Sequence, residues 1–243
     1  MQGKVAMITG ASVGIGRAVA LRLAEEGAKL ILFDLNEETL NKTIEEVKGL
    51  GSECLAFACD VSDEKAVNEA VQKALQKFEK IDVLVNNAAI WRTWEPFLET
   101  SVEKWQKFID VNVMGVVHCI RAVLPQMIEN HYGRIVNVAS VAGVYGNANM
   151  VVYSATKGAL IAMSKSLAKE VVDKGIIVNC VSPGMVSDSS NPDVDSYQST
   201  EMCYAGRTGT NRENANLIYW LVSDEVGYVV GQNIQIDGCR RRI

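Results

Sequence analysis

Short apolar, β-branched runs alternate with longer amphipathic segments along almost the whole chain. The apolar runs predict strands at 4–9, 29–34, 53–58, 81–86, 134–140, 176–182 and 233–237. The amphipathic segments predict helices at about 15–26, 37–50, 63–79, 101–129, 153–173 and 211–222. Several strand runs are apolar almost throughout, which is typical of strands covered on both faces. The alternation predicts an α/β fold with one doubly wound parallel sheet of about seven strands and helices on both faces.

No linker, repeat or low-complexity tract divides the chain, so we expect a single domain over 1–243. Gly27 is placed to end the first helix, and Ser62 is placed to cap the third. The stretch 183–210 has no clear period, and long irregular stretches in compact domains are often functional lids. We therefore predict a substrate-binding loop at 185–210.

The bulk composition is that of an ordinary globular protein, 48% hydrophobic and 22% charged. A net charge of −5 argues against nucleic acid as a partner, and the terminal Arg240–Arg242 cluster is interpreted as a solvated tail. No signal pattern or bilayer-length uncharged apolar stretch is found, so no membrane association is expected. The six cysteines lie mostly in apolar runs and predict reduced core thiols of a cytoplasmic protein. Two histidines and no CxxC predict no metal site.

A glycine loop, TGASVGIG at 9–16, follows the first predicted strand and opens a helix. Gly10, Gly14 and Gly16 would let the backbone approach a pyrophosphate, which the unpaired N–H groups of the helix start would bind. Such a loop is also compatible with a simple tight turn, and its spacing differs from GxGxxG. Asp34 ends the second strand, where a carboxylate accepts hydrogen bonds from ribose hydroxyls and repels a 2′-phosphate. Its alternative role is to cap the helix that starts near residue 36.

Chemistry-bearing positions follow different predicted strands: the loop 9–16, Asp34, Asp60, Asn86, Ser140 and the Pro183-Gly184 pair. Carboxyl ends of parallel strands share one edge of a sheet, and ligands bind there. We therefore expect these positions to line one rim. Tyr153 and Lys157 are four residues apart, on one face of a predicted helix. Alone, that pair could equally be a helix-start aromatic and a solvated lysine.

Taken together, these segments resemble the short-chain dehydrogenase/reductase family over essentially the whole chain. The resemblance rests on TGASVGIG, Asp60-Val61, NNAA at 86–89, Asn112, Ser140, YSATK at 153–157, PG at 183–184 and SDEVGYVVGQNIQIDG at 223–238. It implies a Rossmann-type fold and hydride transfer between a nicotinamide and a carbonyl or alcohol. It implies four catalytic residues: Tyr153 as acid/base, Ser140 as donor to the substrate oxygen, Lys157, and Asn112, which holds a water linked to the lysine. Without the family pattern, Ser140 could be a cap or turn serine, and Asn112 with Gly115 could mark a local helix kink. We expect the Lys157 ammonium and the positively charged oxidised nicotinamide together to lower the pKa of Tyr153.

The resemblance also implies which residues bind the cofactor. They are Gly10, Ser12, Val13, Gly14, Ile15, Gly16, Asp34, Leu35, Asp60, Val61, Asn87, Ala88, Tyr153, Lys157, Pro183, Gly184 and Val186. Ile15 would lie near the nicotinamide, and Asp60-Val61 would flank the adenine. Val13 stands where family members that use NADP often carry a basic residue. Asp34 and Val13 therefore predict NAD rather than NADP.

The chain departs from the family pattern at two positions that bear on the site. Asp188 stands where the family often has a threonine, so either Ser187 or Ser189 substitutes for it or the loop takes another course. Cys239 replaces a glycine near a region of subunit contacts, and a third, minor departure is Ala89 in place of the glycine of NNAG. Substrate-pocket candidates are mostly apolar and favour a hydrophobic secondary alcohol or ketone. They are Trp91, Trp94, Tyr145, Met150, Met185 and Met202, with Arg92, Val186, Tyr197 and Tyr204 as further candidates.

Two alternative functions remain open. A 3-oxoacyl-[acyl-carrier-protein] reductase would use NADPH and dock an acidic carrier, but the segment 126–134 offers little positive charge before Arg134. A catalytically silent nucleotide-binding sensor or scaffold would be expected to lack the tyrosine or the lysine, and both are present. The resemblance further implies a homo-oligomer, a dimer or tetramer, that associates through the helix at 101–129.

Overall fold

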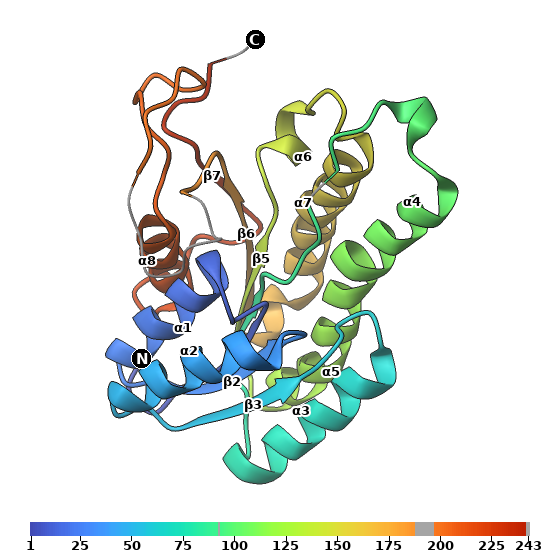
Figure 1. Cartoon of the computed structure of the whole chain (residues 1–243). Helices are drawn as coiled ribbons and strands as arrows, with labels where there is room; N and C mark the ends of the chain where they lie inside the picture. Colours follow the sequence, from blue (N-terminus) through green and yellow to red (C-terminus); the bar gives the residue numbers. More distant parts are fainter. Residues whose placement is uncertain (92, 188–196, 242–243) are drawn as a thin grey trace.

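The computed structural model describes residues 1–91, 93–187 and 197–241 and contains one seven-stranded sheet (Figure 1). All neighbouring strands are parallel, in the order β3-β2-β1-β4-β5-β6-β7. The strands are β1 (Val5–Thr9), β2 (Lys29–Asp34), β3 (Cys54–Ala58), β4 (Val83–Asn86), β5 (Gly133–Val138), β6 (Ile176–Pro183) and β7 (Asn233–Ile236). The predicted α/β fold and the seven predicted strand positions are confirmed.

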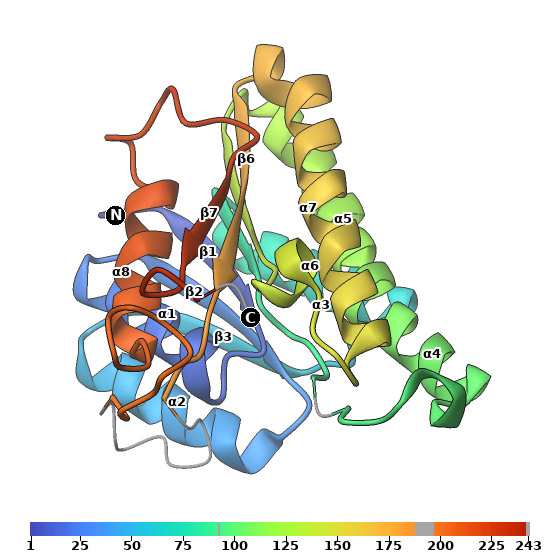
Figure 2. The ribbon, with the colours of Figure 1, turned by 90° about the horizontal axis from the view of Figure 1, so that it is seen from above.

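Helices cover both faces of the sheet (Figures 1 and 2). One face carries α1 (Gly14–Glu25), α2 (Glu37–Gly49) and α8 (Asn211–Val222). The other carries α3 (Glu64–Phe78), α5 (Gly115–Glu129) and α7 (Val151–Val171), with α4 (Val102–Ile109) and the short α6 (Ala142–Tyr145) at the edge near the strand ends. Single 3₁₀ turns lie at Phe97–Glu99 and Val172–Lys174.

The alternation of side chains along each strand separates two apolar cores. In β1, Val5 and Met7 join the core under α3, α5 and α7, whereas Ala6 and Ile8 join the core under α1, α2 and α8. All four are at most 2% exposed. This double burial explains why the strand runs are apolar throughout instead of alternating with polar residues.

The helix caps show that the predicted cap of α3 is wrong and that Asp34 does not cap α2. Asp63, not Ser62, caps α3 by accepting from the Ala66 N–H, and the Ser62 hydroxyl instead donates to Asp60. Asn36 caps α2 by accepting from the Thr39 N–H at 3.1 Å. Because Asn36 has that role, Asp34 is not the cap of α2.

The predicted single helix at 101–129 is wrong in its middle, because Asp110–Met114 forms one π-helical turn between α4 and α5. The wider turn leaves the Asn112 side chain free to bond outside its own helix. A Cβ on Gly115 would lie 2.6 Å from a Val61 methyl, so α5 approaches the segment after β3 closely. By length and apolar composition alone the stretch 102–129 could cross a bilayer, but α5 packs on the sheet as a core helix does.

The six cysteines are free thiols. Four of them are buried as predicted, at 59, 119, 180 and 203, and Cys54 is partly buried. Burial raises the pKa of the Cys59 thiol to about 11, which keeps it protonated and unreactive at neutral pH. Cys239 departs from the prediction and is exposed, because it lies in the segment after β7, outside both cores.

The described part of the predicted lid is ordered by pairing with itself. Val186 bridges Gly209 in parallel, and Ser199 bridges Arg207 in antiparallel orientation. The Thr210 hydroxyl and the Glu213 carboxylate then close a capping box that starts α8. Residues 188–196, including Asp188 and Ser189, lie outside the described residues.

The close packing of α6 on α7 gives a stability prediction. A Cβ on Gly143 would lie 2.6 Å from the Lys157 carbonyl carbon and 2.7 Å from the Gly158 nitrogen. Gly143→Ala should lower the free energy of unfolding by about 1–3 kcal/mol, because backbone atoms cannot yield as a flexible side chain can. Urea denaturation measures this, with Gly49→Ala as the matched control.

Gly49 ends α2, has no atom within 4 Å of an added Cβ, and has an ordinary negative φ. Its alanine variant should be neutral or more stable than the wild type, since alanine favours helix. Equal midpoints for the two variants would contradict the packing argument.

Candidate active site

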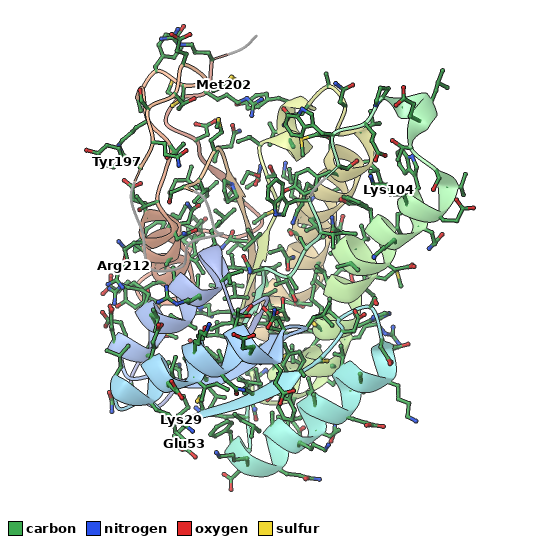
Figure 3. The ribbon with its side chains drawn as sticks, in the orientation of Figure 1. Lys29, Glu53, Lys104, Tyr197, Met202 and Arg212 are labelled. Carbon is green, nitrogen blue, oxygen red and sulfur yellow. The ribbon has the colours of Figure 1, made fainter. Side chains whose placement is uncertain are left out.

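The strand order reverses between β1 and β4, and the carboxyl ends of these two strands carry the glycine loop and the Asn87 segment. At this point the following segments diverge to opposite faces and leave a crevice in which ligands bind. In Figure 3, Lys29 and Glu53 mark the amino ends of β2 and β3, and Met202 lies at the opposite end of the molecule, beyond the carboxyl ends of the strands. The predicted site positions lie at the carboxyl end.

The glycine loop closes so tightly that side chains cannot be accommodated. Gly10 has a φ of +64°, and a Cβ on Gly16 would lie 1.9 Å from the Gly10 carbonyl oxygen. Gly14 also has a positive φ, of +58°. The glycines are therefore required by this backbone and are not incidental.

Asn87 and Thr9 brace the glycine loop from the neighbouring strand end. The Asn87 amide donates to the carbonyls of Thr9 and Gly10 at 3.1 and 3.0 Å. The Thr9 hydroxyl accepts from the backbone N–H groups of Asn87 and Ala88 at 3.0 and 3.1 Å. Thr9 was not predicted as a site residue, although its place directly before the loop glycine was a signal for it.

The residues around the loop fit a nicotinamide dinucleotide. Helix α1 starts after Val13 with no side-chain cap and no acidic residue in its first turn, so its N–H groups remain available for a pyrophosphate. The Asp34 carboxylate accepts from the backbone N–H groups of Ser12 and Asn36 at 3.0 and 3.1 Å. The Ser187 hydroxyl is buried without a partner among the described residues, as a group that awaits a ligand would be.

The other predicted cofactor residues lie at or after the carboxyl ends of β1, β2, β3 and β6. Leu35 is 68% exposed beside Asp34, and the Asp60 carboxylate accepts from the Ser62 N–H. The Val61 carbonyl lies 3.0 Å from His118 Nδ1. The Gly184 N–H donates to the Ile236 carbonyl and so holds the Pro183-Gly184 turn beside β7. The Val141 N–H donates to the Pro183 carbonyl and so holds the same turn beside the segment that follows Ser140. Ile15 and Val186 are partly buried.

Ser140, Tyr153 and Lys157 meet where β5 ends against α7. The Ser140 oxygen accepts from the Ala142 N–H at 3.1 Å, which leaves its own hydrogen to donate. Lys157 Nζ donates to the Val138 carbonyl at 2.7 Å and lies 5.8 Å from the centre of the Tyr153 ring. Tyr153 and Lys157, which share one face of α7, thus lie beside Ser140, which follows β5.

Burial controls the protonation of this group. Burial raises the pKa of Tyr153, and a hydrogen bond with Ser140 offsets part of that rise. Burial lowers the pKa of Lys157 to about 8, against a small opposing effect of Cys180. The lowering that we expect depends on Lys157 and the charged nicotinamide together, and in the protein alone desolvation of the phenolate has the larger effect.

Asn112 holds the segment after β4 against α7. Its amide oxygen accepts from the Ile90 N–H at 2.8 Å, and its nitrogen donates to the Ile90 carbonyl and to Thr156 at 2.9 and 3.1 Å. Thr156 in turn donates to the Tyr153 carbonyl at 2.8 Å. Asn112 therefore connects the cofactor-side segment to the helix that carries Tyr153. Thr156 was not predicted as a site residue.

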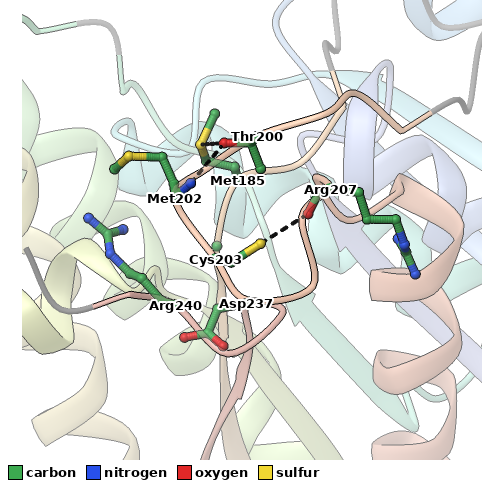
Figure 4. A pocket seen from close by; sticks show the side chains of 8 residues that line it. Met185, Thr200, Met202, Cys203, Arg207, Asp237 and Arg240 are labelled. Carbon is green, nitrogen blue, oxygen red and sulfur yellow. Dashed lines mark hydrogen bonds between the residues drawn. The ribbon is translucent and has the colours of Figure 1, made fainter.

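A pocket opens between the loop after β6 and the C-terminal segment (Figure 4). Met185, Met202, Cys203 and Thr200 line it, together with the charged residues Arg207, Asp237 and Arg240. Met185 and Met202 were predicted as pocket residues. Arg240 was interpreted as part of a solvated tail, and that interpretation is wrong, because the guanidinium bonds Asn147 at 2.7 Å.

The remaining pocket candidates lie elsewhere around the rim. Trp91 and Trp94 are 49% and 71% exposed on the segment after β4. Tyr145 donates to Gln235, and Met150 is buried beneath Asn147. Tyr197 lies under Arg207 and Tyr204 under Arg241, both largely exposed. Arg92 lies outside the described residues.

Comparison with known proteins agrees with this geometry. Residues 4–198 match the family model described as short chain dehydrogenase. A 3-oxoacyl-[acyl-carrier-protein] reductase of Thermotoga maritima is 40% identical over 241 residues, with 98% of each chain covered. An NAD⁺-bound xylitol dehydrogenase is 34% identical, with a TM-score of 0.90 and 98% of each chain covered. A carveol dehydrogenase from Mycobacterium avium in complex with NAD is 29% identical, with a TM-score of 0.92 and 98% of each chain covered.

The chain belongs to the short-chain dehydrogenase/reductase family. It is an oxidoreductase of that family that acts on CH–OH groups, built on a Rossmann-type sheet.

The buried lysine gives a pH prediction. The folded protein releases the Lys157 proton near pH 8, whereas the unfolded chain holds it to about 10.5, so the unfolded state binds more protons between these values. Lys157 therefore makes the free energy of unfolding rise with pH in that window. Relative to Lys157→Met, the wild type should gain about 1–3 kcal/mol between about pH 7 and 10.

Urea unfolding across this pH range measures the difference between the two proteins. Lys165→Met is the matched control, because Lys165 is an exposed lysine of the same helix. Its curve should run parallel to that of the wild type. A Lys157→Met curve that is also parallel would show that Lys157 titrates as an ordinary lysine.

Proposed function

We propose that this chain transfers a hydride between NAD(H) and a secondary alcohol or ketone with an apolar body. The observation that carries the proposal is the convergence of Tyr153, Ser140 and the buried Lys157 at the same edge of the sheet as the glycine loop. Core packing does not account for a lysine that is 3% exposed, because burying an ammonium is costly unless its charge is used. A catalytically silent binder would have no use for this arrangement.

The chain's own residues handle the proton and the oxygen charge. The bound nicotinamide supplies or accepts the hydride. In the reductive direction, Tyr153 donates its hydroxyl proton to the carbonyl oxygen, and the Ser140 hydroxyl donates a hydrogen bond to the same oxygen. The Lys157 ammonium, held by the Val138 carbonyl, favours the phenolate that remains. Asn112 keeps the helix and the segment after β4 in register for this contact.

Tyr153→Phe tests the catalytic assignment. Removing the hydroxyl should lower turnover of any ketone by about 10²–10⁴-fold, because the proton donor is lost. The dissociation constant for NADH, measured by fluorescence titration, should stay the same. Tyr132→Phe is the control, since Tyr132 bonds Asp224 at the opposite end of β5 and should keep full turnover. Full turnover in Tyr153→Phe would contradict the role of Tyr153 as the proton donor.

The preference for NAD rests on Asp34. Its carboxylate lies beside Ser12 of the glycine loop, where it would accept from ribose hydroxyls and repel a 2′-phosphate. The neighbouring cation Arg17 is committed to the Glu46 carboxylate through bonds of 3.0 and 2.7 Å. These contacts support NAD over NADP.

Asp34→Asn separates charge from shape at this position. In the wild type we expect kcat/KM for NADH to exceed that for NADPH by at least about tenfold. The asparagine variant should shrink this ratio by about tenfold, because the amide keeps an acceptor but loses the charge. Glu38→Gln, an exposed acid in the first turn of α2, is the control. A wild-type enzyme that prefers NADPH would contradict the role given to Asp34.

The second candidate function is reduction of a 3-oxoacyl-[acyl-carrier-protein]. The 40% identical relative from Thermotoga maritima bears that name, which favours this candidate. An acidic carrier would need exposed cations, but Arg134 is 8% exposed and faces Asp224 and the Tyr132 ring at the far end of the sheet. NADH and NADPH consumption across simple ketones, 3-oxoacyl thioesters, steroids and sugars separates the two candidates.

We also propose that the chain acts as a cytoplasmic homo-oligomer. The free thiols support a reducing compartment. Val102, Ile109 and Met114 are exposed along the stretch from α4 to α5 and offer an apolar surface for a second copy.

A further inference from the structure

The C-terminal segment Gly238–Arg241, here called the strap, is fixed against the loop that precedes α8. Tyr204 and Ala205 donate backbone hydrogen bonds to the carbonyls of Cys239 and Gly238 at 2.9 and 3.0 Å. Arg241 donates to the Met202 carbonyl at 3.0 Å. These three backbone hydrogen bonds fix the position of the Arg240 backbone, which a free tail would not do.

From the strap, the Arg240 side chain contacts the turn before α7. Its Nη2 donates to the Asn147 side-chain oxygen at 2.7 Å. The Asn147 backbone N–H lies 3.3 Å from the Ser154 hydroxyl, and Ser154 directly follows Tyr153. Arg240 thus lines the same pocket as Met185 and Met202, and two hydrogen bonds connect it to the residue that follows Tyr153.

Among the described residues, Arg240 and Asp237 are the two charged residues at this pocket without an ion-pair partner. Arg207 is paired with Glu213 by bonds of 3.0 and 2.6 Å, and the Asp237 carboxylate accepts from the Cys239 N–H at 3.0 Å. Figure 4 shows the Arg240 guanidinium directed toward Met202 and the Asp237 carboxylate directed away from it. Within residues 1–91, 93–187 and 197–241, Arg240 forms no ion pair, and its one bond is to a neutral amide.

We propose that Arg240 binds a carboxylate at the far end of the substrate whose carbonyl lies against Tyr153. A guanidinium carries five N–H donors, and the bond to Asn147 engages one nitrogen, which leaves donors for a two-point bond to a carboxylate. Asn147 is the positioning residue that aims the guanidinium into the pocket. This inference rests on the proposed function and narrows its substrate class to keto acids and hydroxy acids whose apolar chain contacts Met185 and Met202.

Matched pairs of aliphatic keto acids and their methyl esters test the inference, because each pair differs by one negative charge. The wild type should show a KM for the acid at least about tenfold below that for the ester. Arg240→Gln should raise the KM for the acid by about 10–100-fold, with kcat and all ester constants unchanged. Arg240→Lys should recover part of the acid preference. Arg241→Gln, at the exposed neighbour stacked on Tyr204, should behave as the wild type does.

A binding measurement separates this inference from the proposed function. Calorimetry with the Tyr153→Phe protein loaded with NADH reports acid and ester affinity without turnover. A preference for the acid that Arg240→Gln removes supports the inference, even if no ketone is reduced by the wild type, in which case the proposed function fails alone. Equal wild-type affinity for acid and ester would overturn the inference. An equal loss of acid affinity and ester affinity in Arg240→Gln would also overturn the inference, because that result is expected if Arg240 only stabilises the structure.

Discussion

The parallel direction of all seven strands is the constraint on which the rest of this molecule depends. Parallel neighbours need crossover connections, so helices cover both faces of the sheet, and central strands such as β1 and β4 are buried on both sides. The same direction brings every carboxyl end to one edge. Residues as far apart in the chain as Thr9 and Asn87 therefore come into contact there, and the reversal of strand order between β1 and β4 opens the crevice between them.

The site uses that edge by combining rigid backbone with buried polar groups. The glycine loop is fixed by its own close contacts and by Asn87, while Asn112 and Thr156 hold the π-helical turn against α7. Lys157 is buried against the Val138 carbonyl, and desolvation makes its proton easier to release than that of a surface lysine. Each of these polar groups is costly to bury unless it is paired, so the network also defines one arrangement of strand ends and helices.

Local sequence patterns predicted a feature correctly where a single segment determines it. They failed where the feature depends on contact between two distant segments. The strand positions followed from apolar runs, and the glycine loop followed from its own spacing. The interruption of the helix at 101–129 was predicted only as an alternative, a local kink at Asn112, because the bond that accompanies it joins Asn112 to Ile90 on another segment. Ser62 was chosen as a cap over Asp63 because both residue types cap helices and only the backbone geometry selects between them.

The sequence by itself determined the α/β alternation, the family and the residue types at the strand ends, because periodicity and short-range spacing are properties of local chain segments. Tertiary structure alone decided where Arg240 lies, since a terminal arginine next to two others is typical of a solvated tail. The antiparallel bridge between Cys203 and Arg240 pins the strap, and Asn147 orients the guanidinium. A contact between residues 93 positions apart leaves no periodic trace in the sequence, so only the folded chain could reveal it.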